Sequence, residues 1–314
     1  MQAGLLVGAR LLQYLGALVL LGGSVFHLLV FRSASHESAT EGQWPGQRLM
    51  ALIAALVALI GALFWLAAET ALMNDDPGAA LNPTVLWTIL TETRFGLACS
   101  GRIFLLLLSI AANVAIGHAS GHRVTQAILG AAITMSFAWT GHGAVEISKT
   151  GGLHLVTDLL HLLAAGVWIG ALVPLTMMTV RAKRSDNGLD AYALYCALNS
   201  FSAIGLMVVA VLVLSGIFNS LFLLGPSPWA ELLTSQYGIV LTAKLGLFGI
   251  MLAMAALNRY RLSPALGRAL DLQGARSFAV MTLHKALLKE TGLAVLVLVA
   301  VSFLGDLPPP MMAN

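Results

Sequence analysis

The stretch TGHGAVEISKTGGLHLVTDLLHLLAAGVWIG, residues 140–170, decides the fold of the chain and points to its chemistry. An apolar run that begins within it extends over residues 153–180, longer than the roughly 20 apolar residues with which a helix crosses a bilayer. His154, Asp158 and His161 stand at positions i, i+4 and i+7 of this run, so an α-helix carries all three on one face. Because ionisable groups are costly inside a membrane, such a group indicates a functional site.

The composition excludes a soluble globular domain. Hydrophobic residues make up 58% of the 314, charged residues only 10%, and the mean hydropathy is +0.87. The net charge of +3 comes from loop Lys and Arg residues and does not indicate nucleic-acid binding. Cys99 and Cys196 form no metal motif and no disulfide framework. The run 11–31 is too long for a signal peptide and is interpreted as a retained first span.

Apolar runs of about 20 residues predict an all-α fold, a polytopic membrane bundle of eight transmembrane helices. We expect a single transmembrane domain over residues 1–314. The predicted spans are roughly 5–31, 49–72, 96–117, 124–142, 154–180, 199–224, 238–258 and 284–305.

The distribution of positive charge predicts the orientation of this bundle. Twelve of the 17 Lys and Arg residues lie in or beside the loops that follow spans one, three, five and seven. Positively charged loops stay in the cytoplasm, so both termini are predicted to be periplasmic in a bacterial inner membrane. Glu69, Arg102, Asp158 and Lys244 then lie at similar depths below the outer surface. We expect them to pair across helices, because buried charges need partners.

His142 precedes the polar helix, and His142, His154 and His161 with Asp158 form the predicted metal site. Imidazole suits zinc, copper, iron and nickel, whereas thioether ligands select Cu(I). Methionines at six positions in spans four to seven would continue a copper path inward, namely Met135, Met177, Met178, Met207, Met251 and Met254.

Each of these residues also has a simpler interpretation. Methionine is an ordinary packing residue in membrane helices. Asp158 is either a metal ligand or the ion-pair partner of Arg102 or Lys244. His27, His118 and His122 are scattered toward the predicted cytoplasmic side, where their role is open. The sequence contains no nucleotide-binding or hydrolytic motif, so we expect a protein that is not an enzyme.

Five segments resemble the copper-resistance D (CopD/PcoD) family of bacterial inner-membrane proteins. They are TGHG (140–143), DLLHLLAAGVWIGAL (158–172), SFSAIGLMVVAVLVLSGIFNS (200–220), YGIVLTAKLGLFGIMLAMAALNRYRLSPAL (237–266) and FLGDLPPP (303–310). The resemblance is most specific over about 141–310, and residues 1–140 match mainly in hydrophobic pattern. Thr140 and Gly143 differ from the usual residues around the histidine between them.

The resemblance implies a copper homeostasis protein that takes copper, as Cu(I) or Cu(II), from a periplasmic carrier of the CopC type and moves it toward the cytoplasm. The family's histidine positions fall on His142, His154 and His161. Two alternatives remain open. A b-type haem protein for electron transfer would use histidine pairs on facing spans. A copper-delivery factor would use the same site without transport.

Overall fold

The computed structural model describes residues 2–32, 46–116, 120–140, 151–185, 188–224 and 235–307. These ranges are helical and contain no β-strand, which confirms the predicted all-α class. The α-helices are α1 (Gln2–Arg32), α2 (Gln47–Met73), α3 (Pro83–Glu92), α4 (Arg94–Ala115), α5 (Ser120–Met135), α6 (Gly151–Arg184), α7 (Leu189–Leu224), α9 (Gln236–Leu257), α10 (Ser263–Ala269) and α11 (Gln273–Leu304). The 3-10 turns η1 (Pro77–Leu81) and η2 (Ser136–Trp139) and the π-helical turn η4 (Asn258–Leu262) lie between them.

Seven helices in the described ranges are long and apolar enough to cross a membrane. They are α1, α2, α4, α6, α7, the continuous helix α9–η4–α10, and α11. The predicted span 124–142 corresponds to α5 and η2, where the α-helix has only 16 residues before it tightens into a 3-10 turn. Because about 20 helical residues are needed to span the hydrocarbon core, α5 is shorter than the other predicted spans.

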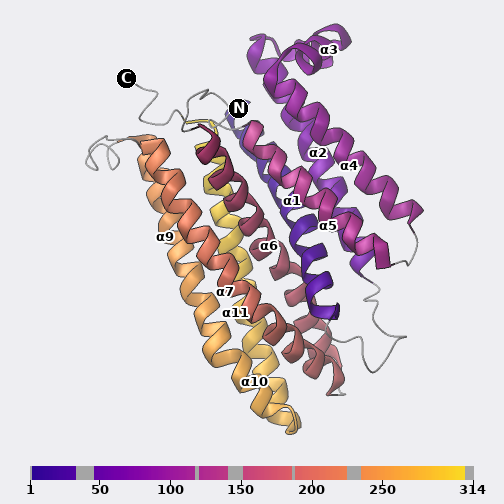
Figure 1. Ribbon diagram of the computed structural model, residues 1–314, viewed down its shortest axis with the longest axis vertical. Coiled ribbons are helices and arrows are strands. Elements are labelled where there is room, and N and C mark those ends of the chain that lie inside the picture. The colour runs from indigo at the N-terminus through magenta and orange to yellow at the C-terminus, as the bar shows by residue number, and fades with distance from the viewer. Residues whose placement is uncertain are drawn as a thin grey trace.

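Helix α1 lies at the centre of the bundle and packs against α2, α5, α6 and α11. Figure 1 shows α2, α4 and α5 on one side of it and α7, α9 and α11 on the other. The beginning of α1 and the end of α11 lie at the same end of the bundle, and α10 lies at the opposite end (Figure 1).

The contact between α1 and α6 depends on three glycines that allow the two backbones to approach closely. A Cβ atom added to Gly22 would lie 2.2 Å from the carbonyl oxygen of Gly166, and one added to Gly170 would lie 2.1 Å from that of Leu18. Small residues at helix crossings are typical of membrane bundles, where packing replaces the hydrophobic effect as the main source of association. These contacts fix α6, the helix with the predicted site residues, against the central helix.

The shared end of α1 and α11 is held by charged side chains. Arg10 of α1 forms an ion pair with Asp306, just after α11, and its guanidinium lies 3.9 Å from the Glu69 carboxylate of α2. Glu69 also accepts a hydrogen bond of 3.2 Å from Trp65. The predicted pairing across helices is therefore confirmed for Glu69.

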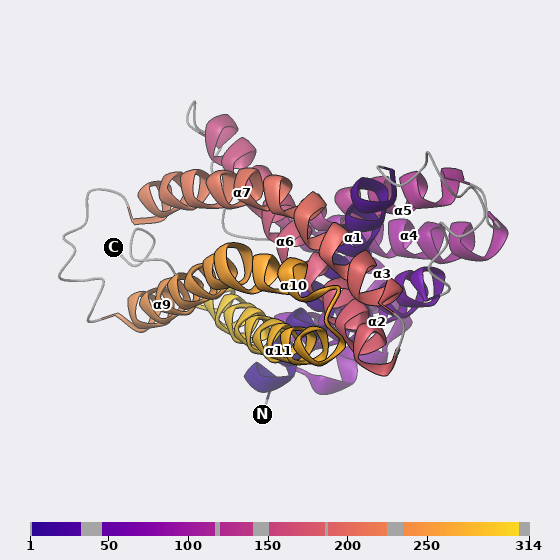
Figure 2. The same cartoon turned by 90° about the horizontal axis from the view of Figure 1, so that it is seen from below.

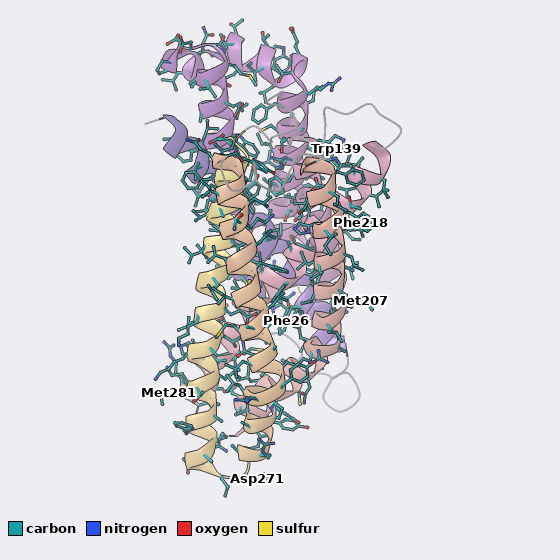
Figure 3. All side chains as sticks on the ribbon, turned by 90° about the vertical axis from the view of Figure 1, so that its left-hand side faces the viewer. Phe26, Trp139, Met207, Phe218, Asp271 and Met281 are labelled. Atoms are coloured by element: carbon teal, nitrogen blue, oxygen red, sulfur yellow. The ribbon has the colours of Figure 1, made fainter. Side chains whose placement is uncertain are left out.

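The outer surface of the bundle is apolar, as a lipid-facing surface requires. Figure 3 shows Met207 and Phe218 on the outside of α7, where they are 70% and 46% exposed. Phe26 of α1 lies inside and is completely buried. The chain is thus a multi-pass membrane protein in both composition and architecture.

Candidate metal centre

The predicted helical register of the site is confirmed, because His154, Asp158 and His161 all lie in α6. His154 and Asp158 are near the beginning of this helix, at the end of the bundle where α1 starts (Figure 1). His142 belongs to residues 141–150, which lie outside the described ranges.

Helix α7 supplies a set of polar partners to the polar face of α6. Asn219 donates a hydrogen bond from its side-chain nitrogen to Asp158 Oδ1 at 3.4 Å, and its Oδ1 lies 2.8 Å from the Thr157 hydroxyl oxygen. The ring of His154 stacks on Phe222, with ring centroids 5.1 Å apart. The polar face of α6 therefore packs against a neighbouring helix and does not face lipid.

The hydrogen bond of His161 determines which ring nitrogen is available. Ser215 Oγ lies 2.6 Å from the Val211 carbonyl oxygen, to which it donates its proton, and 3.1 Å from His161 Nδ1. Because that proton is already used, Ser215 accepts a hydrogen bond from His161 Nδ1–H. Nε2 then carries a lone pair, and within the described ranges it makes no hydrogen bond. A neutral imidazole fixed at one nitrogen and open at the other is the usual form of a metal-binding histidine.

Asp158 has a different environment from the one expected for an ion-pair partner. Arg102 lies elsewhere, and Lys244 of α9 makes no contact of 4 Å or less with the Asp158 carboxylate. Lys244 and His154 still act on Asp158 electrostatically at longer range. The carboxylate therefore has one long hydrogen bond to Asn219 and no direct cation, so it can accept one.

Spacing along α6 limits which residues can share an ion. His154 and His161 are seven residues apart, about 10 Å along the helix axis. Metal–nitrogen bonds are about 2 Å long, so Asp158, one turn from each histidine, is the residue that can share an ion with either. Within the part of the chain that the structure describes, no three His, Cys, Asp or Glu side chains converge to hold a metal. Three-ligand binding thus needs a movement of α6 or a ligand from 141–150, the segment that contains His142.

Arg102 fixes the backbone immediately before that segment. Its side chain is completely buried and donates hydrogen bonds to Gln13 Oε1 at 3.1 Å, to the carbonyl and hydroxyl oxygens of Ser136 at 3.0 and 2.7 Å, and to Thr140 Oγ1 at 3.1 Å. Its guanidinium also lies 4.2 Å from the ring centroid of Phe137, a cation–π contact. Arg102 therefore connects α1, α4 and η2, and its contact with Thr140 lies two residues before His142.

Replacing Arg102 by lysine should lower the free energy of unfolding by about 1–3 kcal/mol, because the three donors of an ammonium group cannot replace the planar guanidinium and buried acceptors are left unpaired. The measurement is thermal unfolding of purified protein in detergent. Arg261→Lys is the matched control, since Arg261 is exposed. Equal melting temperatures for the two variants would contradict this role.

The predicted methionine path is not continuous. Met178 and Met251 are buried in the apolar cluster that also contains Trp168. Met207 faces outward from α7 (Figure 3). The buried pair contributes to packing in this cluster, and Met207 has no access to the interior.

Sequence reasoning missed the polar residues of α7 and a buried carboxylate, Glu290 of α11. Ser215 and Asn219 are four residues apart in an otherwise apolar helix, a spacing that could have indicated a polar face opposite α6. Glu290 is 3% exposed and accepts a hydrogen bond from Trp168 Nε1 at 3.1 Å. The signal for Glu290 was a single carboxylate inside the last apolar run.

Taken together, fold and site define a multi-pass helical membrane protein with an imidazole and carboxylate face enclosed between two of its helices. Comparisons with known proteins identify the family. Residues 1–152 match the family model described as Copper resistance protein D-like, N-terminal domain, and residues 196–304 match the model described as Copper resistance protein D. The chain belongs to the copper resistance protein D family.

Three curated relatives show how far the similarity extends. Copper resistance protein D of Pseudomonas syringae pv. tomato is 32% identical over 317 residues, which cover both chains completely. Inner membrane protein YebZ of Escherichia coli is 28% identical over 82% of this chain and 83% of its own length. Copper transport protein CutJ of Bacillus subtilis is 26% identical over 87% of this chain and 50% of its own length. No solved structure matches the chain.

Proposed function

We propose that this protein binds copper at the periplasmic face of the inner membrane and moves it toward the cytoplasm. His154, Asp158 and His161 of α6, together with His142, supply the ligands. The observation that carries the proposal is the orientation of His161, whose Nδ1 is held by Ser215 so that Nε2 is open. Membership of the copper resistance protein D family supports copper as the ion.

The topology that goes with this function has eight spans, with α5 as the short fourth span and both termini in the periplasm. Two observations support it. The beginning of α1 and the end of α11 lie at the same end of the bundle (Figure 1), as an even number of spans requires. The 12 Lys and Arg residues of the predicted cytoplasmic loops favour the opposite end as the inner one. With this orientation His154 lies toward the outer entrance, and a carrier of the CopC type can deliver copper there.

Copper uptake into proteoliposomes tests transport. Purified protein in vesicles should accumulate radioactive copper added outside, and an Asp158→Asn variant should accumulate much less, because one ligand loses its charge. Ser302→Ala is the control, since Ser302 bonds only its own helix through the Leu298 carbonyl. Copper that binds to the vesicles without entering them would instead favour the delivery factor.

The haem alternative makes a separate prediction. A b-type haem needs two histidines on facing helices. The cavity between α6, α7, α9 and α11 has no histidine in its lining. We therefore expect protein purified in native lipids to show no Soret absorption, and a stoichiometric Soret band would overturn the copper assignment.

A further inference from the structure

Glu290 is a buried carboxylate that the copper site does not use. It lies near the middle of α11, and both of its oxygens accept hydrogen bonds from neutral donors. Trp168 Nε1 donates to Oε1 at 3.1 Å, and the Asn258 side-chain nitrogen donates to Oε2 at 2.6 Å. Among the described residues no Lys, Arg or His forms an ion pair with it. A buried charge without a counter-ion is expensive, so Glu290 needs a bound cation or a proton.

A cavity gives a small ion access to this carboxylate. It has a volume of about 270 Å³ and lies between α6, α7, α9 and α11, with an almost wholly apolar wall. Figure 2, seen from below, shows α7 separated from the continuous helix of α9 and α10. The charged or titratable side chains that line the cavity are Glu290, Arg259 and Tyr260. Arg259 donates a hydrogen bond to the Ser202 carbonyl oxygen of α7.

Two further oxygens in the same cavity have no hydrogen-bond partner. Asn258 Oδ1 and Ser263 Oγ are both unpaired, although their residues are only 7% and 6% exposed. Both residues line the cavity together with Glu290. Unpaired buried oxygens cost free energy. A carboxylate, an amide oxygen and a hydroxyl oxygen together are the hard oxygen ligands that suit a small hard cation and not a soft one such as Cu(I).

The backbone is irregular at the same place. Residues Asn258–Leu262 form a π-helical turn between α9 and α10, directly beside the two unpaired oxygens. π-Helical turns are often found at functional sites. In membrane transporters, interrupted helices near the middle of the bundle provide oxygen ligands for Na⁺ or H⁺. Here the interruption coincides with Glu290, near the middle of α11.

We propose that Glu290, Asn258 and Ser263 form a binding site for one small monovalent cation, a proton or a sodium ion, separate from the histidine site. Trp168 connects the two sites, because it lies two turns beyond His161 in α6 and donates to Glu290. Binding or release of this ion changes the charge inside the bundle by one unit. It therefore provides a place where an ion gradient can act on the protein.

Labelling with dicyclohexylcarbodiimide tests the site, because this apolar reagent modifies carboxyl groups that carry a proton. Full-length protein in lipid nanodiscs is labelled in sodium-free choline buffer from mildly acidic to mildly alkaline pH, and each carboxylate is read out by peptide mass spectrometry. Glu290 should be labelled at least roughly tenfold faster than Glu69, whose carboxylate lies beside Arg10. If the ion is sodium, added NaCl protects Glu290. If the ion is a proton, NaCl has no effect and labelling falls as the pH rises.

Ser263→Ala separates ion binding from a structural role. In this variant the sodium concentration that gives half protection, or the pH of half labelling, should shift by about threefold or more in ion concentration. Ser302→Ala, which removes a buried serine hydroxyl of α11 outside the cavity, should leave both values unchanged. Copper binding should stay unchanged in Glu290→Gln, since the two sites are separate. The proposal is overturned if Glu290 is labelled no faster than Glu69, or if its labelling responds to neither pH nor sodium.

Discussion

Replacement of His161 by alanine is expected to weaken copper binding by more than about 100-fold, because loss of a group that only orients a metal ligand already costs about 10- to 100-fold. The variant removes the imidazole whose Nε2 is open and whose Nδ1 is held by Ser215. Ser215→Ala removes only the orienting hydroxyl and should cause the smaller loss. Both affinities can be measured by competition with a copper chelator of known affinity.

His284→Ala is the matched control for this experiment. His284 Nδ1 lies 2.7 Å from the Thr179 hydroxyl oxygen, so it makes the same kind of hydrogen bond between α11 and the other half of α6. Its loss should leave copper affinity within error of the original protein. Unchanged affinity and stoichiometry in His161→Ala would remove His161 from the copper site, as would an equal loss in His284→Ala.

Substitution of Gly170 by leucine is expected to prevent assembly of the bundle. A Cβ atom at this position would lie 2.1 Å from the Leu18 carbonyl oxygen and 2.7 Å from the Gly22 Cα atom. Both obstacles belong to the backbone of α1 and cannot rotate away, so α1 and α6 must separate. Overpacking of this kind costs about 1–3 kcal/mol even where side chains can adjust, and rigid backbone raises the cost. The measurement is the yield of monodisperse protein after size-exclusion chromatography in mild detergent.

Gly249→Leu is the control, since an added Cβ atom at Gly249 meets no atom within 4 Å. This variant should be purified in normal yield. Normal yield and an unchanged melting temperature for Gly170→Leu would show that the contact between α1 and α6 is looser than described.

The helices could be predicted from the sequence because hydrophobic length alone defines a membrane span. The short helix α5 and the π-helical turn at Asn258 could not, because both result from local hydrogen bonding that composition does not reveal. The central position of α1 also could not be predicted. It depends on close contacts such as that of Gly22 with α6, and a single sequence does not show which glycines face each other.

The register of His154, Asp158 and His161 could be predicted because helical periodicity fixes which residues share a face. Their partners could not. Arg102 was a possible partner of Asp158 by depth alone, yet it binds uncharged acceptors of α1 and η2. The actual partner, Asn219, is uncharged and lies in another helix. Charge and depth therefore identify buried polar residues but do not decide which of them meet.

X-ray absorption at the copper edge, on copper-loaded full-length protein, tests the central claim most directly. The account predicts nitrogen neighbours with the outer-shell scattering of imidazole, and a clear loss of this signal in the His154→Ala, His161→Ala double variant. Copper surrounded only by sulfur, or an imidazole signal that the double variant leaves intact, would contradict it.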